Sequence, residues 1–208
     1  MKLRSIALVL APALAVALAS AAHAQSGVYV TMDAQQFTQE GVNTHPLAGS
    51  MNIDRPWLYG PGYGVYFDIT HLPKLGALKT GPVVIGLDGR GDTLRLSEYH
   101  SQFNRQDGIL SLRIATKKPF LKSIPYIQGG FGIAHTKVPF RTAFSNNFIY
   151  QFSIGADHKI AKNIDWRVVE ASAGFLANYN TGYSPTGLGA NQSNYLVTLA
   201  TGIVFHLH

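Results

Sequence analysis

The stretch that decides the fold is WLYGPGYGVYFDIT, residues Trp57 to Thr70. Every second residue from Trp57 is Trp, Tyr, Pro, Tyr, Val, Phe and Ile, whereas the residues between them are Leu, Gly, Gly, Gly, Tyr, Asp and Thr. This period of two is that of a β-strand with one bulky apolar face and one mostly small or polar face. The class of protein therefore depends on which face meets the solvent.

The composition indicates that part of the exterior does not face water. Charged residues make up only 13% of the chain, which is about half the share usual in soluble globular proteins. A water-soluble surface normally needs more charge than this. The absence of cysteine excludes a disulfide framework, a thiolate nucleophile and a cysteine-based zinc site.

The first 24 residues predict a cleaved secretory signal peptide. A basic start, MKLRS, is followed by an apolar run, IALVLAPALAVALAS, and by the small-x-small site Ala22–Ala24. We therefore expect one mature domain over residues 25–208. Loss of Lys2 and Arg4 lowers the formal charge from +6 to +4. Such a weakly basic, exported chain indicates no nucleic-acid partner.

Alternation of the same kind recurs along the mature chain and predicts eight strands. The predicted strands span residues 28–38, 57–70, 82–92, 109–116, 124–134, 148–159, 166–179 and 195–207. Arg167 and Glu170 are three residues apart, so simple alternation places them on opposite faces. A β-bulge near Val168–Val169 would bring both to one face; the alternative is that Glu170 pairs with a partner on an adjacent strand.

The connections between these strands alternate in length, as in an up-and-down meander. The long ones span residues 41–56, 93–107, 136–147 and 180–194, and the short ones span 71–81, 117–123 and 160–164. Seven of the eight lysines of the mature chain lie in or beside the short connections: Lys74, Lys79, Lys117, Lys118, Lys122, Lys159 and Lys162.

Side-chain volume decides the orientation of the two faces. An eight-stranded barrel has an interior just wide enough for side chains. The Gly, Ser, Thr and Asp set fits that space with a few Arg and Tyr, whereas the Trp, Phe, Ile and Val set does not. Apolar-out alternation is typical of an outer-membrane barrel, with short periplasmic turns and long extracellular loops. The prediction is thus an all-β protein, an eight-stranded antiparallel up-and-down transmembrane β-barrel of the bacterial outer membrane.

Two sets of residues follow from this orientation. An aromatic girdle at the membrane interfaces is predicted to comprise Trp57, Tyr59, Phe148, Tyr150, Trp166, Tyr195 and Phe205. A charge network in the lumen is predicted to comprise Asp33, Asp68, Asp88, Arg90, Arg113, Asp157, Arg167 and Glu170. Buried charges must pair or stay hydrated. This charge network could form a gate or the lining of a narrow pore. It could instead form a plug of ion pairs that fills the lumen, and the small interior of an eight-stranded barrel favours the plug.

The last third of the chain resembles the OmpA/OmpX-type family of small outer-membrane barrels. The resemblance lies in PYIQGGFGIA (residues 125–134), FIYQFSIGADHKIAKNIDWRV (148–168) and NYLVTLATGIVFHL (194–207). It implies eight strands without a periplasmic domain, and a final strand that the barrel insertion machinery recognises through Gly202, Phe205 and Leu207. Ala200 departs from that pattern, and the chain continues to His208.

No catalytic, metal or cofactor site is predicted. His45, His71, His100 and His135 are scattered, and no serine and acid accompany a histidine at the spacing of a lipid deacylase site. His206 and His208 share a face and could together ligate a metal ion. At the end of a strand, however, two such histidines are more often polar residues at the membrane edge than metal ligands. The Gly-rich run Gly86–Asp92 is not followed by a predicted helix that could complete a phosphate-binding site. Its last three residues, Arg90–Asp92, spell the integrin-type motif RGD, but so short a motif is common by chance.

These observations predict a monomeric outer-membrane barrel with a structural or surface-interaction role rather than an enzyme. Its expected partners are membrane lipid, lipopolysaccharide, the insertion machinery and an unidentified ligand of the long loops. One alternative is a narrow OmpW-like channel for small or apolar solutes. The others are a lipid-modifying barrel enzyme and a soluble periplasmic barrel.

Overall fold

The computed structural model describes residues 26–37, 43–44, 51–52, 57–72, 83–96, 104–116, 119–137, 144–179 and 192–207. Their eight long strands are β1 (Ser26–Phe37), β4 (Trp57–Leu72), β5 (Val83–Leu96), β6 (Asn104–Thr116), β7 (Ser123–Lys137), β8 (Phe144–Ala161), β9 (Ile164–Tyr179) and β10 (Gln192–Leu207). The short strands β2 (Asn43–Thr44) and β3 (Met51–Asn52) pair with each other. The predicted signal peptide lies outside the described residues. None of the described residues forms a helix long and apolar enough to cross a bilayer.

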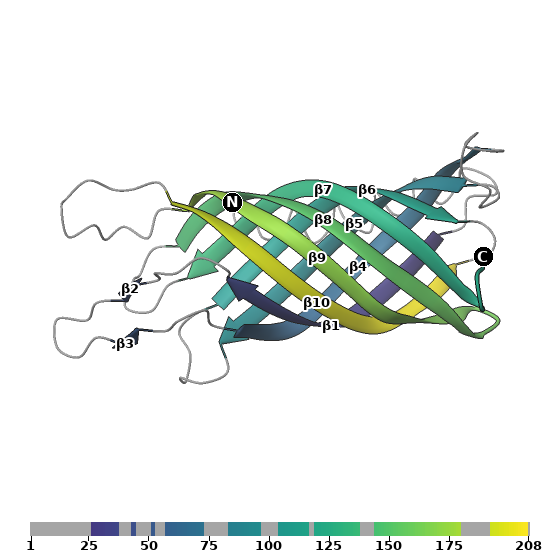
Figure 1. Cartoon of the computed structure of the whole chain (residues 1–208), viewed down its shortest axis with the longest axis horizontal. Helices are drawn as coiled ribbons and strands as arrows, with labels where there is room; N and C mark the ends of the chain where they lie inside the picture. The colour runs from purple at the N-terminus through teal and green to yellow at the C-terminus, as the bar shows by residue number, and fades with distance from the viewer. Residues whose placement is uncertain are drawn as a thin grey trace, which may run out of the picture.

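The eight long strands form one closed antiparallel barrel, as the sequence predicts. Strands that follow one another in the chain are neighbours in the barrel, and β1 closes the ring by pairing with both β4 and β10. Ser26 lies opposite Leu207, so the barrel begins and ends at one end, which also carries the short connections and is called the turn end here. The opposite end, beyond which β2 and β3 lie, is called the loop end (Figure 1). Closure of the ring pairs the backbone N–H and C=O groups of every strand edge. Unpaired groups of this kind would be costly in the hydrocarbon of a bilayer.

The strands are longer than the sequence predicts, mainly at the loop end. β5 continues to Leu96 and β6 begins at Asn104, so most of the predicted connection 93–107 is strand. Arg105 and Asp107, which that prediction places in a loop, are buried inside the barrel. The reason is that their alternation continues in phase with Ser111 and Arg113 on the same strand. The predicted connection 41–56 likewise contains β2 and β3.

The bulky face points outward, which confirms the predicted orientation. Phe131, Met32 and Tyr63 are about 60% exposed, at 62%, 63% and 59%, although large apolar side chains are normally buried in soluble proteins. The charged residues Asp88, Arg167 and Glu170, by contrast, are fully buried in the interior. This inverted polarity is that of a transmembrane β-barrel, in which lipid contacts the apolar exterior.

One part of the interior differs from the expected small and polar lining. Seven inward-facing apolar side chains form a cluster in the loop-end half of the barrel, which we call the apolar layer: Leu58, Leu94, Ile109, Ala134, Ile149, Leu176 and Leu196. They come from seven consecutive strands, β4 through β10. Alternation places members such as Leu58 on the inner face, but it does not show that these apolar side chains meet at one height of the barrel.

The register of β9 contains a bulge, which is the first of the two alternatives that the sequence leaves open for Arg167 and Glu170. Opposite β10, the pairing shifts between Ala200, which faces Glu170, and Gly202, which faces Arg167. The pairing with β8 shifts at the same place, between Ala156 and Asp157. One extra residue on β9 therefore places both Arg167 and Glu170 in the interior, where both are fully buried.

The tight turn between β6 and β7 has an unusual backbone. Leu121 and Lys122 have φ values of 51° and 65°, and hydrogen bonds of 2.8 and 2.9 Å join Phe120 and Ser123 on either side. Two successive positive φ angles are typical of a type I′ hairpin turn, which favours Asn-Gly. A bulky residue in this region is strained by about 1 kcal/mol or more.

Replacing this pair by Leu121→Asn and Lys122→Gly is expected to stabilise the barrel by about 1–2 kcal/mol, because it removes the strain at both positions. Urea unfolding in lipid vesicles, followed by tryptophan fluorescence, measures the change. The same two substitutions in reverse order, Leu121→Gly and Lys122→Asn, serve as a composition control. An unchanged or lowered stability in both variants would show that the turn stores no strain.

Candidate functional site: the charged barrel interior

The predicted lumen residues all lie in the interior, each at most 7% exposed. Asp92, Arg105, Asp107 and Asp165 join them there. Among the described side chains the interior thus holds eight carboxylates and four guanidinium groups. The carboxylates are Asp33, Asp68, Asp88, Asp92, Asp107, Asp157, Asp165 and Glu170, and the guanidinium groups are Arg90, Arg105, Arg113 and Arg167. Acidic groups are therefore in excess.

Arg90 on β5 is the centre of this network. Its guanidinium lies 2.9 Å from Asp33 Oδ2 on β1 and 2.8 Å from Asp92 Oδ1 on its own strand, and Nη1 donates to Glu170 Oε1 on β9. In the ring of eight strands β5 and β9 are opposite each other. The pair between Arg90 and Glu170 therefore crosses the whole lumen.

Two further arginines stack between tyrosine rings. The Arg113 guanidinium carbon lies 4.2 Å from the ring centre of Tyr66 and 4.5 Å from that of Tyr126. Arg167 lies 5.0 Å from Tyr126 and 4.1 Å from Tyr29. The order Tyr66, Arg113, Tyr126, Arg167, Tyr29 thus forms a continuous stack of rings and cations, each contact being favourable when desolvated.

Hydrogen bonds tie the tyrosines of this stack to the acids. Tyr126 donates to Glu170 Oε2 at 2.6 Å, and Tyr29 donates to Asp88 Oδ1 at 2.8 Å. Space for the rings comes from glycine on the neighbouring strand: a Cβ at Gly155 would lie 2.5 Å from the Tyr126 ring. Cross-strand pairs of an aromatic residue and glycine are a known device of curved sheets.

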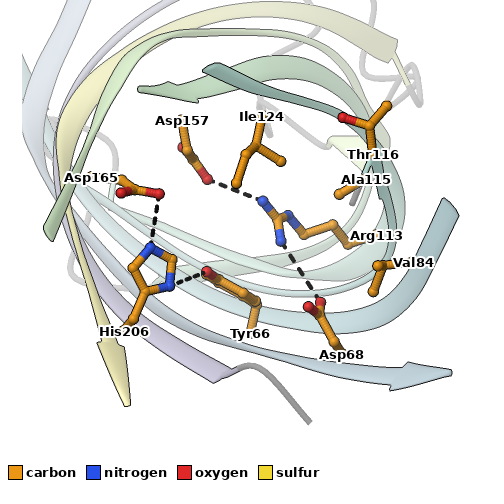
Figure 2. A pocket seen from close by; sticks show the side chains of 10 residues that line it. All are labelled: Tyr66, Asp68, Val84, Arg113, Ala115, Thr116, Ile124, Asp157, Asp165 and His206. Atoms are coloured by element: carbon orange, nitrogen blue, oxygen red, sulfur yellow. Dashed lines mark hydrogen bonds and ion pairs between the residues drawn. The ribbon is translucent and has the colours of Figure 1, made fainter. Parts of the chain in front are cut away.

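A small pocket lies in the barrel at the turn end (Figure 2). On one side of it Arg113 donates to Asp157 Oδ2 at 3.0 Å and lies 3.9 Å from Asp68 Oδ1. On another side His206 Nε2 lies 2.8 Å from Asp165 Oδ2, and His206 Nδ1 lies 3.1 Å from the Tyr66 hydroxyl. His206, treated above as a polar strand-end residue, is thus part of the interior network.

A second polar group lies towards the loop end. Arg105 donates to Asp107 Oδ1 at 2.7 Å and to Gln35 Oε1 at 2.7 Å, and Gln35 donates to Thr198 Oγ1 at 2.9 Å. These contacts join β6 to β1 and β10. Sequence reasoning missed Arg105 and Asp107 because it began this strand at residue 109, whereas β6 begins at Asn104; continuing the alternation back from Ile109 would have found both.

The predicted girdle residues lie on the outside of the barrel. Tyr150, Phe175 and Tyr195 form adjacent ring contacts on β8, β9 and β10, with centroid distances of 6.5 and 5.6 Å, and Trp57 stacks with Tyr59 at 6.4 Å. The other predicted members, Phe148, Trp166 and Phe205, are exposed as well. In the predicted insertion signal, Phe205 and Leu207 point outward, while Gly202 packs closely on β1.

One serine and one histidine meet outside the interior. Ser123 Oγ and His158 Nδ1 are 2.9 Å apart near the turn end. In the part of the chain that the structure describes, no carboxylate bonds to the other ring nitrogen of His158, so the third group of a hydrolytic triad has no counterpart. His135 bonds to Asn146. The described residues also contain no group of three or more side chains placed to hold a metal ion.

Comparisons with known proteins found matches only among solved structures. No family model and no curated protein matches the sequence. Neisserial surface protein A matches at 10% identity and a TM-score of 0.48, over 86% of this chain and 96% of its own. The N-terminal β-barrel domain of Pseudomonas aeruginosa OprF matches at 13% identity and 0.44, over 88% and 100%. Ail of Yersinia pestis, the attachment invasion locus protein, matches at 9% and 0.44, over 88% and 98%.

By its own strand order, closure and inverted polarity, the chain has the architecture of the small eight-stranded OmpA/OmpX-type barrels that its sequence resembles.

Proposed function

We propose that this protein is a non-enzymatic barrel of the bacterial outer membrane, closed to ions along its axis, that acts through its surface. In this proposal the interior holds the wall rigid, and the long connections at the loop end bind an extracellular ligand. Lipid, lipopolysaccharide and the insertion machinery are its other partners, and it works as a monomer.

The observation that carries this proposal is the contact of Arg90 with three carboxylates from β1, β5 and β9. A cation held between opposite walls leaves an ion no continuous path unless several buried pairs break. Breaking such pairs is costly, because each leaves an uncompensated charge. The apolar layer adds a second barrier, since apolar constrictions in pores exclude water and ions.

Planar-bilayer recording with the purified, refolded protein tests the closed lumen. We expect no discrete conductance steps above the protein-free background in concentrated potassium chloride. Heat-modifiable migration on a gel establishes that the inserted protein is folded, so silence cannot be attributed to misfolding. Replacing the outward residue Leu112 by alanine should leave the recordings silent.

Steady conductance of the folded wild-type protein would support the channel alternative instead. The excess of carboxylates in the interior favours cations over anions in that case. Reversal potentials in a salt gradient would then give the sign of the preferred ion. The surface role has its own test: deletion of residues 181–190 should abolish ligand capture by intact cells while the barrel remains in the outer-membrane fraction.

A further inference from the structure

Two turns lie side by side at the turn end of the barrel and carry exposed lysines. The Lys159 backbone N–H donates to the Lys122 carbonyl oxygen at 3.0 Å, which joins the end of β8 to the turn before β7. Lys162 lies in the next turn, between β8 and β9. These three lysines, together with the exposed Phe120, Leu121 and Ile160, are called the basic turn patch here.

Nothing described in the structure neutralises the charge of this patch. Lys122, Lys159 and Lys162 are exposed, and none forms an ion pair with a described residue. Asp165 lies opposite Lys159 in the register of β8 and β9, but it bonds to His206, and Asp157 binds Arg113. In the sequence, the three short connections also contain Lys74, Lys79, Lys117 and Lys118 and no aspartate or glutamate.

The patch is also strongly apolar. Phe120, Leu121 and Ile160 are 72%, 79% and 59% exposed. A turn surrounded by water would favour polar residues instead. Apolar side chains between lysines are typical of segments that lie at a bilayer interface, where the rings and methyl groups enter the acyl boundary and the ammonium groups reach the headgroups.

The position along the barrel fits this interface. Among the β8 side chains that the structure describes, the outward apolar ones begin at Phe148, and Lys159 follows eleven residues later. At about 3.4 Å per residue and a tilt near 40°, this separation corresponds to roughly 29 Å along the barrel axis. The apolar band of such barrels is about 25 Å tall. Lys159 therefore emerges just beyond the hydrocarbon, at the depth of the lipid phosphates.

The strained turn points to the same role. Leu121 and Lys122 keep positive φ angles that Asn-Gly would adopt without strain. Backbone strain of this kind is often found at functional positions, where the side chains matter more than local stability. Here the strained turn carries two exposed side chains in succession, one apolar and one cationic.

We propose that the basic turn patch binds the phosphate headgroups of anionic phospholipids in the leaflet at the turn end of the barrel. Lys122, Lys159 and Lys162 contact the phosphate oxygens, while Phe120, Leu121 and Ile160 insert among the upper acyl carbons. The inference relies on the membrane location proposed above. It adds a lipid preference that the barrel architecture by itself does not require.

In the test, the refolded mature protein is placed in bicelles that contain both phosphatidylcholine and phosphatidylglycerol. Native mass spectrometry then measures how much of each lipid stays bound to wild type and to each variant. We expect wild-type protein to retain phosphatidylglycerol over phosphatidylcholine by about fivefold or more, and this preference to fall in high salt, which screens exposed charges. The variant Lys122→Gln, Lys159→Gln, Lys162→Gln should retain the two lipids equally. Arg95→Gln, an exposed cation near the loop end, should behave like wild type.

The Leu121→Asn, Lys122→Gly variant separates lipid binding from folding. It should be more stable than wild type and yet show a weaker lipid preference, which a folding defect cannot produce. The inference is overturned by equal retention in wild type, by a preference that survives in the triple variant, or by an equal loss in Arg95→Gln. Failure of the wild-type chain to enter bicelles of any composition would instead count against the proposed membrane location.

Discussion

Replacing Arg90 by methionine is expected to lower the free energy of unfolding by about 3–5 kcal/mol, the usual cost of removing one partner of a buried ion pair. The side chain lies between Asp33, Asp92 and Glu170, and it is 5% exposed. Methionine fills a similar volume but leaves three carboxylates facing one another without a cation. Urea unfolding in lipid vesicles at neutral pH measures the loss.

Arg95→Met is the matched control, because the same substitution is then made on the exposed face of the same strand. Its effect should stay within about 0.5 kcal/mol, as for most surface substitutions. Adding Glu170→Gln and Asp33→Asn to Arg90→Met should restore part of the stability, since the uncompensated charges are then removed as well. Equal stability of Arg90→Met and wild type would show that the interior network does not hold the barrel together.

Gly132→Ala is expected to destabilise the barrel by about 3 kcal/mol or more, or to prevent folding. A Cβ at this inward position on β7 would lie 1.9 Å from the Gly108 carbonyl oxygen and 2.8 Å from Ile109 Cα on β6. Both atoms belong to the backbone, so they cannot move aside without separating the two strands. Overpacking of this kind is among the mechanisms that produce large losses. The fraction that shifts on a heat-modifiable gel, followed by urea unfolding, measures it.

Gly108→Ala provides the control on the partner strand. Nothing lies within 4 Å of a Cβ at Gly108, which points outward, so alanine there meets open space. It also restricts the unfolded chain, and the expected change is therefore slight or mildly stabilising. If both glycines tolerate alanine equally, the close approach of β6 and β7 is not a constraint on the sequence.

The alternation in the sequence was sufficient to predict the strands, their faces and the closed antiparallel barrel. Trp57–Thr70 alone separates Tyr59 and Tyr63 on the lipid side from Tyr66 and Asp68 on the inside, and the structure follows this division. For the irregular strand the sequence left two alternatives, a bulge or a separate partner for Glu170, and the register shows the bulge. Local periodicity carries this information, because it depends only on neighbouring residues and on which side is apolar.

The partners of the inward residues could not be predicted in this way. The sequence places Arg90 and Glu170 in the lumen, but only closure of the ring with its particular register brings them together across it. Closure and register also bring His206 to Asp165 and Tyr66. They likewise bring the side chains of the apolar layer together at one height, although leucine also occurs on the lipid face. Periodicity determines the side of the sheet on which a residue lies; the tilt and stagger of the closed barrel determine its height and its neighbours.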